Sequence, residues 1–558
     1  MKKLILIVAA SALIVVGAKN SYCETYWAKS YGGTEHDYAA SIRQTPDGDY
    51  LVAGHTYSFG NGYYDVWVLK LDSNGNILLQ KTYGSSTTET TRAMELTSEG
   101  GCVVAAVLGD PVILGDDADI WLIKLDKNGN IEWQKKYNQS RWDSVTSIQQ
   151  TPDNGYIVLG RSRINDDYDT WILKLDKNGV IQWQRLYRGN NDEFGNCLIK
   201  TANGEYVIGG LVQYVDYQTY KIWANILMLK LDSDGNIIWQ KQYGDGKHYV
   251  GTSSIQQTQD GEFIVAGGIS DPEDYLDSTM CVLKLDVSGN MVWQKTYGGS
   301  VRHAGLTILQ SSDKNYIIAG ESPTSENYYK AWLLKLNQEG EVLWQKTYGG
   351  DKENSVSSIV TTDDDGFIMT GYTSSFPPYA LYDVWVLKMD RNGDIPGCNI
   401  IGAGNPIIAN ALLAEVPSGI TLDTANGASS DTNVDTQNGL GGMNVICENY
   451  TLVNLASFTA APYSHRVVLR WVTASEIDND GFNIYRSKTE GGEYIKINSS
   501  IIPAQGSVTQ GASYEYVDTD VQNRKTYYYK LEDTDLSGNS TTHGPVRATP
   551  RLIYGMGK

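Results

Sequence analysis

One short segment recurs seven times along this chain and constrains its fold more than any other feature. VWVLKLDSNGN around Lys70 returns as IWLIKLDKNGN, TWILKLDKNGV, ILMLKLDSDGN, MCVLKLDVSGN, AWLLKLNQEGE and VWVLKMDRNGD. The lysine shared by these copies is Lys70, Lys124, Lys174, Lys230, Lys284, Lys335 and Lys388, at intervals of 54, 50, 56, 54, 51 and 53 residues. A period of this length indicates stacked supersecondary units that bury their apolar faces against one another.

Each unit contains four short runs with the character of β-strands. In the third unit they are VTSIQQT, YIVLG, DTWILKLD and VIQWQRLY, separated by a turn at 152–155, a polar loop and a turn at 177–179. Asn-Gly and Asp-Gly between β-branched and aromatic runs favour hairpins, because glycine adopts the positive φ that such turns need. Four antiparallel strands per unit are typical of a propeller blade. The sequence therefore predicts an all-β fold containing a seven-bladed β-propeller over residues 24–397.

The fourth strand, with the pattern WQKxYG, follows the first six copies but not the seventh, where Ile395-Pro396-Gly397 stands. Proline cannot donate to a strand ladder. The missing strand occurs at the start of the chain, as YWAKSYGG over residues 26–33. We therefore expect the N-terminal strand to complete the seventh unit, which would close the ring and leave no exposed sheet edge there.

These motifs resemble those of bacterial secreted propellers built from delta-sixty-like repeats, whose pattern is DGGYIVAG…DVWVLKLDxNGNIxWQKTYGG. The resemblance covers residues 25–397. It implies a β-propeller in an extracellular setting. It implies no active site, since no molecular function is generally assigned to that group.

The repeat ends at Cys398, and residues 398–450 are rich in small polar residues, which is typical of a flexible linker. Cys398 and Cys447 flank this stretch, and we expect them to form a disulfide in an exported protein. Cys102, Cys197 and Cys281 fall on predicted strands, where we expect buried thiols. Residues 451–550 alternate like a β-sandwich and resemble a fibronectin type III domain in Trp471 and the run 527–529. A tail follows over 551–558.

The N-terminus carries Lys2 and Lys3 before an apolar run from Leu4 to Val16, which predicts a signal peptide over 1–23. Cleavage after Ala18 and cleavage after Cys23 both fit. We therefore expect a secreted protein located outside the cell, at the cell surface or in the periplasm. The formal net charge of −20 disfavours nucleic acid as a partner. No later run is long enough for membrane insertion, and we expect a monomer.

Several motifs that suggest chemistry have simpler interpretations. The DxNGN turns are hairpin connections and do not supply the six to eight oxygen ligands of a typical calcium site. The histidines in loops have no carboxylate at a fixed spacing. Eleven of the fourteen tryptophans recur at one position of the third or fourth strand, which indicates packing between units. We therefore expect no metal, no cofactor and no catalytic residue.

Length varies mainly between the second and third strands of each unit. From each repeated lysine to the next turn the spacing is 27 or 28 residues, whereas from that turn to the following lysine it is 23 to 29. Insertions of this kind indicate the binding side of a repeat protein. The loops of this side are rich in aromatic residues, which suit a sugar or a protein partner. The candidate ligand-binding residues are Tyr63, Tyr64, Trp142, Tyr214, Tyr217, Tyr220 and Trp223.

The favoured interpretation is a non-enzymatic binding or scaffold protein that recognises a glycan or an extracellular protein. The alternative is a secreted polysaccharide-active enzyme, a lyase or a hydrolase, on the same scaffold. The discriminating feature is a cluster of acids, histidine or arginine that converges from several units on the loop side. A single sequence does not reveal such convergence between units.

Overall fold

The computed structural model is built of β-strands. It describes residues 26–551 except 110–116, 299–303, 325–327, 377–380, 397, 399, 404–406, 410–413, 417–420, 425–427, 432–434, 439–441, 450–452, 477–478, 507–510 and 536–539. The described residues contain 43 strands and no helix, so the prediction of an all-β chain is confirmed. None of them forms a helix long and apolar enough to cross a membrane. The predicted signal peptide lies outside these residues, as does most of the tail.

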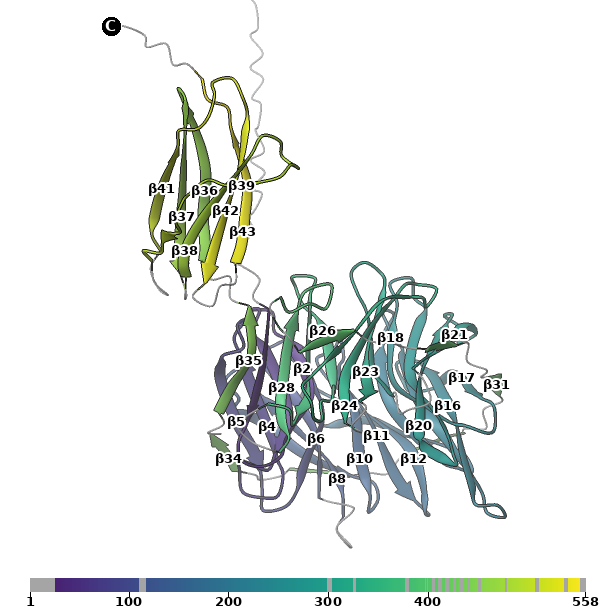
Figure 1. The fold of residues 1–558 in the computed structure, drawn as a ribbon. Coiled ribbons are helices and arrows are strands. Elements are labelled where there is room, and N and C mark those ends of the chain that lie inside the picture. Colours follow the sequence, from purple (N-terminus) through teal and green to yellow (C-terminus); the bar gives the residue numbers. More distant parts are fainter. Residues whose placement is uncertain are drawn as a thin grey trace, which may run out of the picture. The chain divides into compact units, whose positions relative to one another are not determined.

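The chain divides into two compact units, one over residues 26–449 and one that contains residues 450–558 (Figure 1). The larger unit holds seven antiparallel four-stranded repeats, each with its strands in the order first, second, third, fourth. The first strands are β2 (Asp37–Gln44), β6 (Glu89–Leu96), β10 (Asp143–Gln150), β14 (Asp192–Lys200), β18 (Tyr249–Gln257), β22 (Ala304–Gln310) and β26 (Ser358–Thr361). The second strands are β3 (Tyr50–Thr56), β7 (Cys102–Leu108), β11 (Tyr156–Ile164), β15 (Tyr206–Asp216), β19 (Phe263–Asp271), β23 (Tyr316–Pro323) and β27 (Phe367–Thr373).

The third and fourth strands complete each repeat. The third strands are β4 (Asp65–Leu71), β8 (Asp119–Leu125), β12 (Asp167–Leu175), β16 (Lys221–Leu231), β20 (Asp274–Leu285), β24 (Tyr329–Leu336) and β28 (Asp383–Met389). The fourth strands are β5 (Ile77–Gly84), β9 (Ile131–Asn138), β13 (Ile181–Arg188), β17 (Ile237–Gly244), β21 (Met291–Gly298), β25 (Val342–Tyr348) and, for the seventh repeat, β1 (Tyr26–Gly32). β1 pairs with β28 through Trp27↔Lys388 to Tyr31↔Val384, which is the pairing that the sequence predicts for the N-terminal strand.

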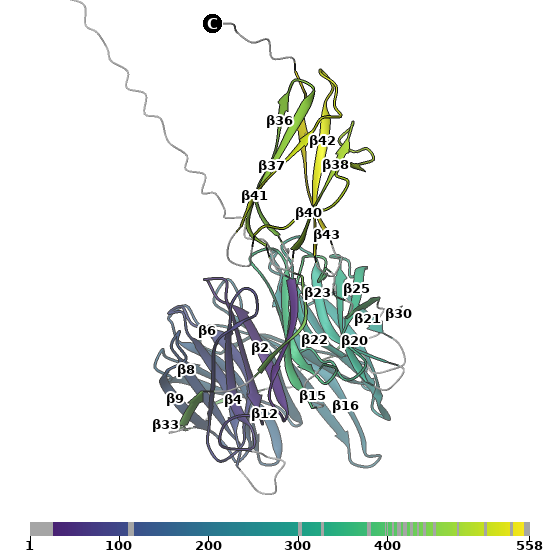
Figure 2. The ribbon, with the colours of Figure 1, turned by 60° about the vertical axis from the view of Figure 1, so that its left-hand side comes forward.

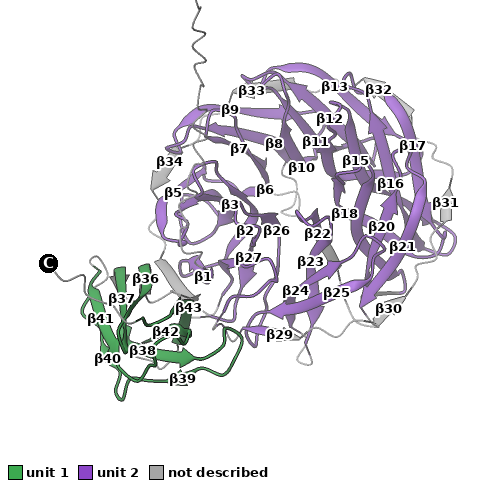
Figure 3. Ribbon diagram, turned by 90° about the horizontal axis from the view of Figure 1, so that it is seen from above, with its two compact units in different colours: residues 1–25, 450–558 green, residues 26–449 purple. Residues whose placement is uncertain are grey.

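Neighbouring repeats contact one another through their first strands, from β2 through β6, β10, β14, β18, β22 and β26 and back to β2. Figure 3 shows the repeats following one another around the larger unit, and Figure 2 shows β2 and β4 beside β6 and β8. We call the first strands the inner strands. Because neighbouring inner strands contact one another along this cycle, a residue near the start of one inner strand lies close to residues of the adjacent repeats.

A tyrosine near the end of each fourth strand links that repeat to the next. Its hydroxyl donates to the carbonyl of a glycine in the following repeat's third turn, as Tyr31 does to Gly75 at 2.7 Å. The same bond joins Tyr83 to Gly129, Tyr137 to Gly179, Tyr187 to Gly235, Tyr243 to Gly289, Tyr297 to Gly340 and Tyr348 to Gly393. These seven buried bonds form a cycle, since Tyr31 belongs to the seventh repeat and Gly75 to the first.

The same glycines also contact the fourth-strand tryptophans. A Cβ added to Gly75 would lie 2.8 Å from the Trp27 ring, and its φ of +77° is one that glycine adopts most easily. Equivalent contacts join Gly179 to Trp133, Gly235 to Trp183, Gly289 to Trp239, Gly340 to Trp293 and Gly393 to Trp344. The third-strand tryptophans Trp67, Trp121, Trp171, Trp332 and Trp385 are buried. The recurring tryptophans are therefore packing residues between or within repeats.

The stretch predicted to be a flexible linker has a different structure. It contains seven short strands, each paired antiparallel with the outer edge of one repeat. They are β29 (Ile401–Ala403) on β25, β30 (Ile407–Ala409) on β21, β31 (Ala414–Val416) on β17, β32 (Thr421–Thr424) on β13, β33 (Ala428–Asp431) on β9, β34 (Asp435–Asn438) on β5 and β35 (Gly442–Asn449) on β1. Successive strands begin 6 or 7 residues apart and follow the repeats in reverse order. They satisfy backbone groups that the fourth strands would otherwise expose.

The described cysteines are of two kinds, free and disulfide-bonded. Cys102, Cys197 and Cys281 are free, and burial raises the pKa of each thiol to about 12. Cys398 is disulfide-bonded and packs against a buried cluster that includes Ala28. The backbone of Cys447 pairs with Ala28, while its side chain lies outside the described part of the chain. The pairing of Cys398 with Cys447 stays a prediction.

The smaller unit contains two antiparallel sheets. One consists of β36 (Val453–Tyr463), β37 (Arg466–Glu476) and β41 (Ser513–Asp518), and the other of β38 (Asn479–Ser487), β39 (Ile495–Lys496), β40 (Ile502–Pro503), β42 (Tyr527–Asp535) and β43 (Ser540–Ala548). One buried core draws residues from both sheets. In it Trp471 stacks on Tyr514 with ring centroids 5.1 Å apart, and the hydroxyl of Tyr529 donates to Asp518 at 2.9 Å. These are the tryptophan and the tyrosine run that the sequence singles out.

Candidate functional site

The residues predicted to bind ligand fall into three groups of ring contacts. The first group is on the hairpin of β15 and β16, whose strands have 11 residues each. Tyr214 and Trp223 face each other across this hairpin, stacked with centroids 5.5 Å apart, and both are half-buried. Tyr217 and Tyr220 near the tip are 81% and 83% exposed. Trp223 therefore packs within its own hairpin, and only the tip tyrosines present open rings.

The second group contains Trp142, which directly precedes β10. The Arg163 guanidinium lies 4.2 Å from the centroid of its ring, and Arg163 also pairs with Asp166 at 3.5 Å. The indole is half-buried. One face of Trp142 is thus covered by a cation, an arrangement that stabilises the local loop as well as the ring.

The third group contains Tyr63 and Tyr64, and it leads to a larger cluster. Tyr63 is 58% exposed and stacks on Tyr57 at 6.1 Å. Tyr64 meets His55 edge-on at 5.2 Å and lies 6.2 Å from Tyr38 on the inner strand β2. From Tyr38 the ring contacts continue to the seventh repeat.

Sequence reasoning missed the residues around Tyr38, although the repeats contain a signal for them. Six second strands carry a glycine at one position (Gly54, Gly160, Gly210, Gly267, Gly320 and Gly371), and the second repeat has Ala106 there. The residue that follows differs in chemistry from repeat to repeat: His55, Val107, Arg161, Leu211, Gly268, Glu321 and Tyr372. It pairs with a residue near the start of the inner strand, as His55 does with Tyr38 and Arg161 with Ser144. We call Tyr38, His55, Arg92, Arg161, Glu321 and Tyr372 the inner cluster.

Aromatic rings occupy the side of the inner cluster that belongs to the first and seventh repeats. Tyr38 stacks on His55 at 5.3 Å and meets Tyr372 edge-on at 5.1 Å. Tyr382 lies 5.6 Å from Tyr38 and 5.0 Å from Tyr372. Burial raises the pKa of Tyr372 to about 12 and also raises that of Tyr38. Both phenols therefore keep their protons at neutral pH, and their hydroxyl groups are of a kind that hydrogen-bonds a sugar.

His55 is a buried imidazole without a charged partner. Burial, with the nearby Arg92 guanidinium as a second cause, lowers its pKa to about 3. Its Nδ1 atom is buried and has no hydrogen-bond partner among the described residues. The ring is therefore neutral at ordinary pH.

Two carboxylates, Glu321 and Glu353, come from the sixth and seventh repeats and affect the pKa of the same tyrosine, Tyr372. The Ser355 hydroxyl donates to Glu321, and the Tyr329 amide donates to Oε2 of Glu353 at 3.2 Å. The negative charges of Glu321 and Glu353 both contribute to the raised pKa of Tyr372. The structure thus brings together two acids, a neutral histidine and phenolic hydroxyls, which are groups used in acid–base chemistry.

A second repeated device holds the loops that lead into the inner strands. An acid at the start of the strand accepts the amide of the residue four positions earlier. Asp37 accepts from Gly33 at 2.8 Å, Asp143 from Gln139 at 2.7 Å and Glu193 from Gly189 at 2.8 Å. Burial raises the pKa of all three carboxyls. These buried clamps fix the loop backbone, so the neighbouring inner cluster rests on a preorganised frame.

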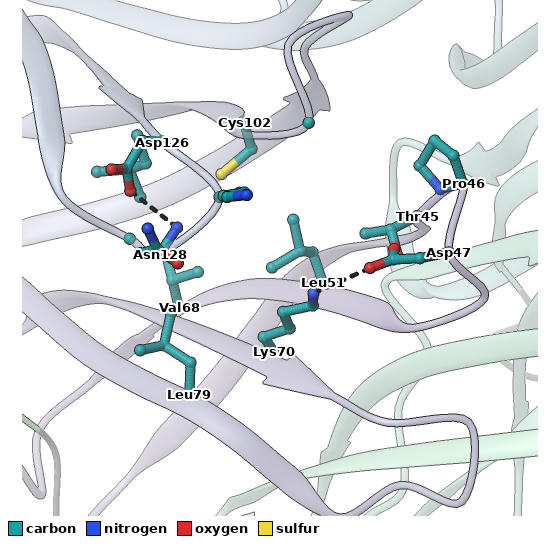
Figure 4. A pocket seen from close by; sticks show the side chains of 14 residues that line it. Thr45, Pro46, Asp47, Leu51, Val68, Lys70, Leu79, Cys102, Asp126 and Asn128 are labelled. Atoms are coloured by element: carbon teal, nitrogen blue, oxygen red, sulfur yellow. Dashed lines mark hydrogen bonds and ion pairs between the residues drawn. The ribbon is translucent and has the colours of Figure 1, made fainter.

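A pocket of about 420 Å³ lies between the first and second repeats, at the other end of the strands. Figure 4 shows Leu51, Val68, Leu79 and Cys102 in it, with Lys70 directed toward Asp47. Elsewhere a fourth-strand tryptophan packs on the ring that opens the next second strand, as Trp133 does on Tyr156 at 5.9 Å. Here Leu79 and Cys102 take those two positions. The pocket is therefore where an aromatic packing pair is replaced by smaller residues.

We predict that Leu79→Trp with Cys102→Tyr stabilises the fold by about 1–2 kcal/mol, because the pair fills this pocket. Guanidinium denaturation of the double variant measures the gain. The matched control, Trp133→Leu with Tyr156→Cys, creates the same gap at the next junction and should lower stability. A double variant less stable than the parent would mean that the pocket has no room for the rings.

Within the described residues, no group of three His, Cys, Asp or Glu side chains could hold a metal ion.

No family model matches the chain. A curated relative, an amylopullulanase of Thermoanaerobacter thermohydrosulfuricus, is 40% identical over 91 residues, which cover 16% of this chain and 6% of that protein. Among solved structures, an Fn3-like protein from Clostridium thermocellum is 21% identical, with 18% of this chain and 93% of that chain covered and a TM-score of 0.12. The β-fructofuranosidase of Bombyx mori is 8% identical, with 73% and 87% covered and a TM-score of 0.26.

The expectation that this chain is not an enzyme is wrong on these comparisons. The relative that shares 91 residues with it is an amylopullulanase. The coarser expectation agrees with the fold: the chain is a β-rich repeat protein.

Proposed function

We propose that this chain is a secreted enzyme that cleaves polysaccharides by hydrolysing glycosidic bonds at the inner cluster. The observation that carries the proposal is that Glu321 and Glu353 both act on Tyr372, whose ring contacts Tyr38 and, through Tyr38, His55. Most glycoside hydrolases work with two carboxyl groups on either side of the scissile bond. The partial match to an amylopullulanase supports the same reaction class.

The two carboxyl groups take different parts in this proposal. Glu321 accepts the Ser355 hydroxyl, and such a bond favours the ionised form. Glu353 also accepts a hydrogen bond, from the Tyr329 amide, so in this proposal one of the two carboxyl groups activates water or attacks the anomeric carbon and the other protonates the leaving oxygen. The hydroxyl groups of Tyr38 and Tyr372 bind the sugar, and the neutral His55 supports Tyr38 by stacking on it at 5.3 Å.

The architecture around this site is part of the proposal. The seven repeats form a seven-bladed β-propeller of the delta-sixty-like kind over residues 24–397, closed by β1. The cycle of inner-strand contacts and the seven tyrosine–glycine bonds support this assignment. Residues 451–550 form a fibronectin type III-like sandwich, in agreement with the core around Trp471. A signal peptide over 1–23 directs export, and a disulfide joins Cys398 to Cys447.

The loop-side aromatic residues have a supporting part in this function. The tip tyrosines Tyr217 and Tyr220 and the stacked Tyr63 are the exposed rings among the predicted residues. We propose that they contact polysaccharide chains outside the inner cluster, whereas Tyr64 belongs to the cluster's aromatic border.

A screen of reducing-end release tests the proposal. The secreted full-length chain is incubated with neutral and acidic polysaccharides, and new reducing ends are measured over time. We expect release from at least one polymer, and no release after the double change Glu321→Gln with Glu353→Gln. Failure to cleave any polymer by a folded preparation, or equal cleavage by the double variant, would refute the proposal.

A further inference from the structure

Two arginines of the inner cluster come from adjacent repeats and lie within each other's electrostatic reach. Arg92 is at the β-bulge of β6, between Thr91 and Ala93, and Arg161 is on β11. Burial lowers the pKa of both, and the charge of Arg92 lowers that of Arg161 further. The Arg92 side chain is accessible to solvent, yet protein atoms surround it closely enough for desolvation to disfavour its charge.

Neither guanidinium has a carboxylate partner among the residues that the structure describes. Nε of Arg161 is buried and makes no hydrogen bond there, while the guanidinium lies 5.2 Å from the centroid of the Phe194 ring. Other arginines on these strands are paired, as Arg43 is with Glu95 at 3.7 Å and Arg163 with Asp166 at 3.5 Å. The chain has a net charge of −20, so acidic side chains outnumber basic ones. Even so, Arg92 and Arg161 have no carboxylate partner among the described residues.

The repeat shows that these arginines are not needed for the packing of a unit. The residue at the bulge position of Arg92 is Ala40, Thr146, Asn196 or Ser253 in other repeats. The position of Arg161 is Val107 or Leu211 in the neighbouring repeats. Two like charges that are partly desolvated oppose folding unless an anion joins them. A guanidinium fork matches the oxygens of a carboxylate or of a tetrahedral oxyanion.

We propose that Arg92 and Arg161 bind the negatively charged group of an acidic sugar, so that the polysaccharide cleaved at the inner cluster is anionic. This inference rests on the proposed function. Phe194 beside Arg161 supplies the ring against which the sugar packs. A carboxylate on a uronic acid and a sulfate ester carry the same charge for this purpose, and the experiment separates them.

Binding is measured by isothermal titration calorimetry with oligogalacturonate, a sulfated galactan oligosaccharide and a neutral maltooligosaccharide. We expect one of the two acidic ligands to bind more tightly than the neutral one, and its affinity to fall as salt rises. The Arg92→Gln and Arg161→Gln variants should each bind it at least about tenfold more weakly. Arg141→Gln is the control, because Arg141 is 60% exposed and pairs with Asp117 at 3.1 Å; it should bind like the parent.

Thermal melting without ligand gives a second readout that does not depend on activity. Removing one of two like charges should leave the melting temperature unchanged or raise it. Lower melting temperatures for both variants, or unchanged affinity for every acidic ligand, would overturn the proposal. Cleavage of a neutral polymer, with no binding of acidic ligands, would overturn this inference and leave the hydrolase proposal intact. Binding of an acidic ligand that depends on Arg92 and Arg161, with no cleavage of any polymer, would overturn the hydrolase proposal and leave the acidic-sugar site intact.

Discussion

The Glu321→Gln variant is expected to lose at least about a hundredfold of its polysaccharide-cleaving rate, as befits removal of an acid–base group. The substitution keeps the size of the side chain and its bond from the Ser355 hydroxyl, so the fold should be preserved. The measurement is the initial rate of reducing-end release, with the melting temperature recorded for the same preparation.

Glu339→Gln is the matched control for this result, because Glu339 is an exposed acid of the same repeat, in the turn at the other end of the strands. It should cleave at the rate of the parent. Tyr217→Ala, on the exposed hairpin tip, should retain most of the rate. Full activity of Glu321→Gln would remove this residue from the mechanism.

Deleting residues 24–33 is expected to cause the largest loss of stability of any change considered. β1 stands between β28 and β35, so its removal exposes two unpaired edges. It also removes Trp27, which is fully buried and donates to the Ser73 carbonyl at 3.1 Å, and Tyr31, which bonds Gly75. Trp27→Ala alone should cost about 3–5 kcal/mol, and the deletion more.

Chemical denaturation and sedimentation of the deletion variant test this expectation. We expect a large drop in the unfolding midpoint together with self-association through the exposed edges. The control is Trp223→Ala, because Trp223 is half-buried within its own hairpin and its loss should change stability far less. A deletion variant that melts like the intact chain and stays monomeric would refute closure by β1.

The repeat predicts most of the larger unit because the same packing contacts recur seven times. A residue such as the tyrosine of the WQKxYG pattern meets an equivalent glycine at every junction, so its spacing in the sequence marks the strand. The same logic predicts the partner of the orphan strand at Trp27, since a fourth strand was missing only in the seventh copy.

The outer strands β29–β35 could not be predicted in the same way. A strand of three or four residues is too short to show an alternation of apolar and polar residues, so a run such as Thr421–Thr424 resembles a linker. The signal that remained was a spacing of 6 or 7 residues between successive strands, which matches one strand per repeat.

The inner cluster was missed for the opposite reason: it consists of residues that do not repeat. Tyr38 and Tyr372 are far apart in the sequence and 5.1 Å apart as rings, because the first and seventh repeats are neighbours through β2 and β26. The selection of aromatic residues in the loops included Tyr64, which lies at the border of this cluster. It also included Trp223, whose ring is covered by Tyr214. His55, Arg161 and Glu321 each directly follow the recurring glycine of a second strand. A comparison of the residues after this glycine in all seven repeats would have identified the three together.

The most direct test of the central claim is to locate a bound oligosaccharide. A crystal structure is determined for the double variant Glu321→Gln with Glu353→Gln, soaked with a fragment of a polymer that the parent cleaves. We predict a sugar against Tyr38 and Tyr372, with its glycosidic oxygen between residues 321 and 353. A sugar bound only at Tyr217 and Tyr220, or only on the unit that contains Trp471, would contradict the assignment of the inner cluster as the active site.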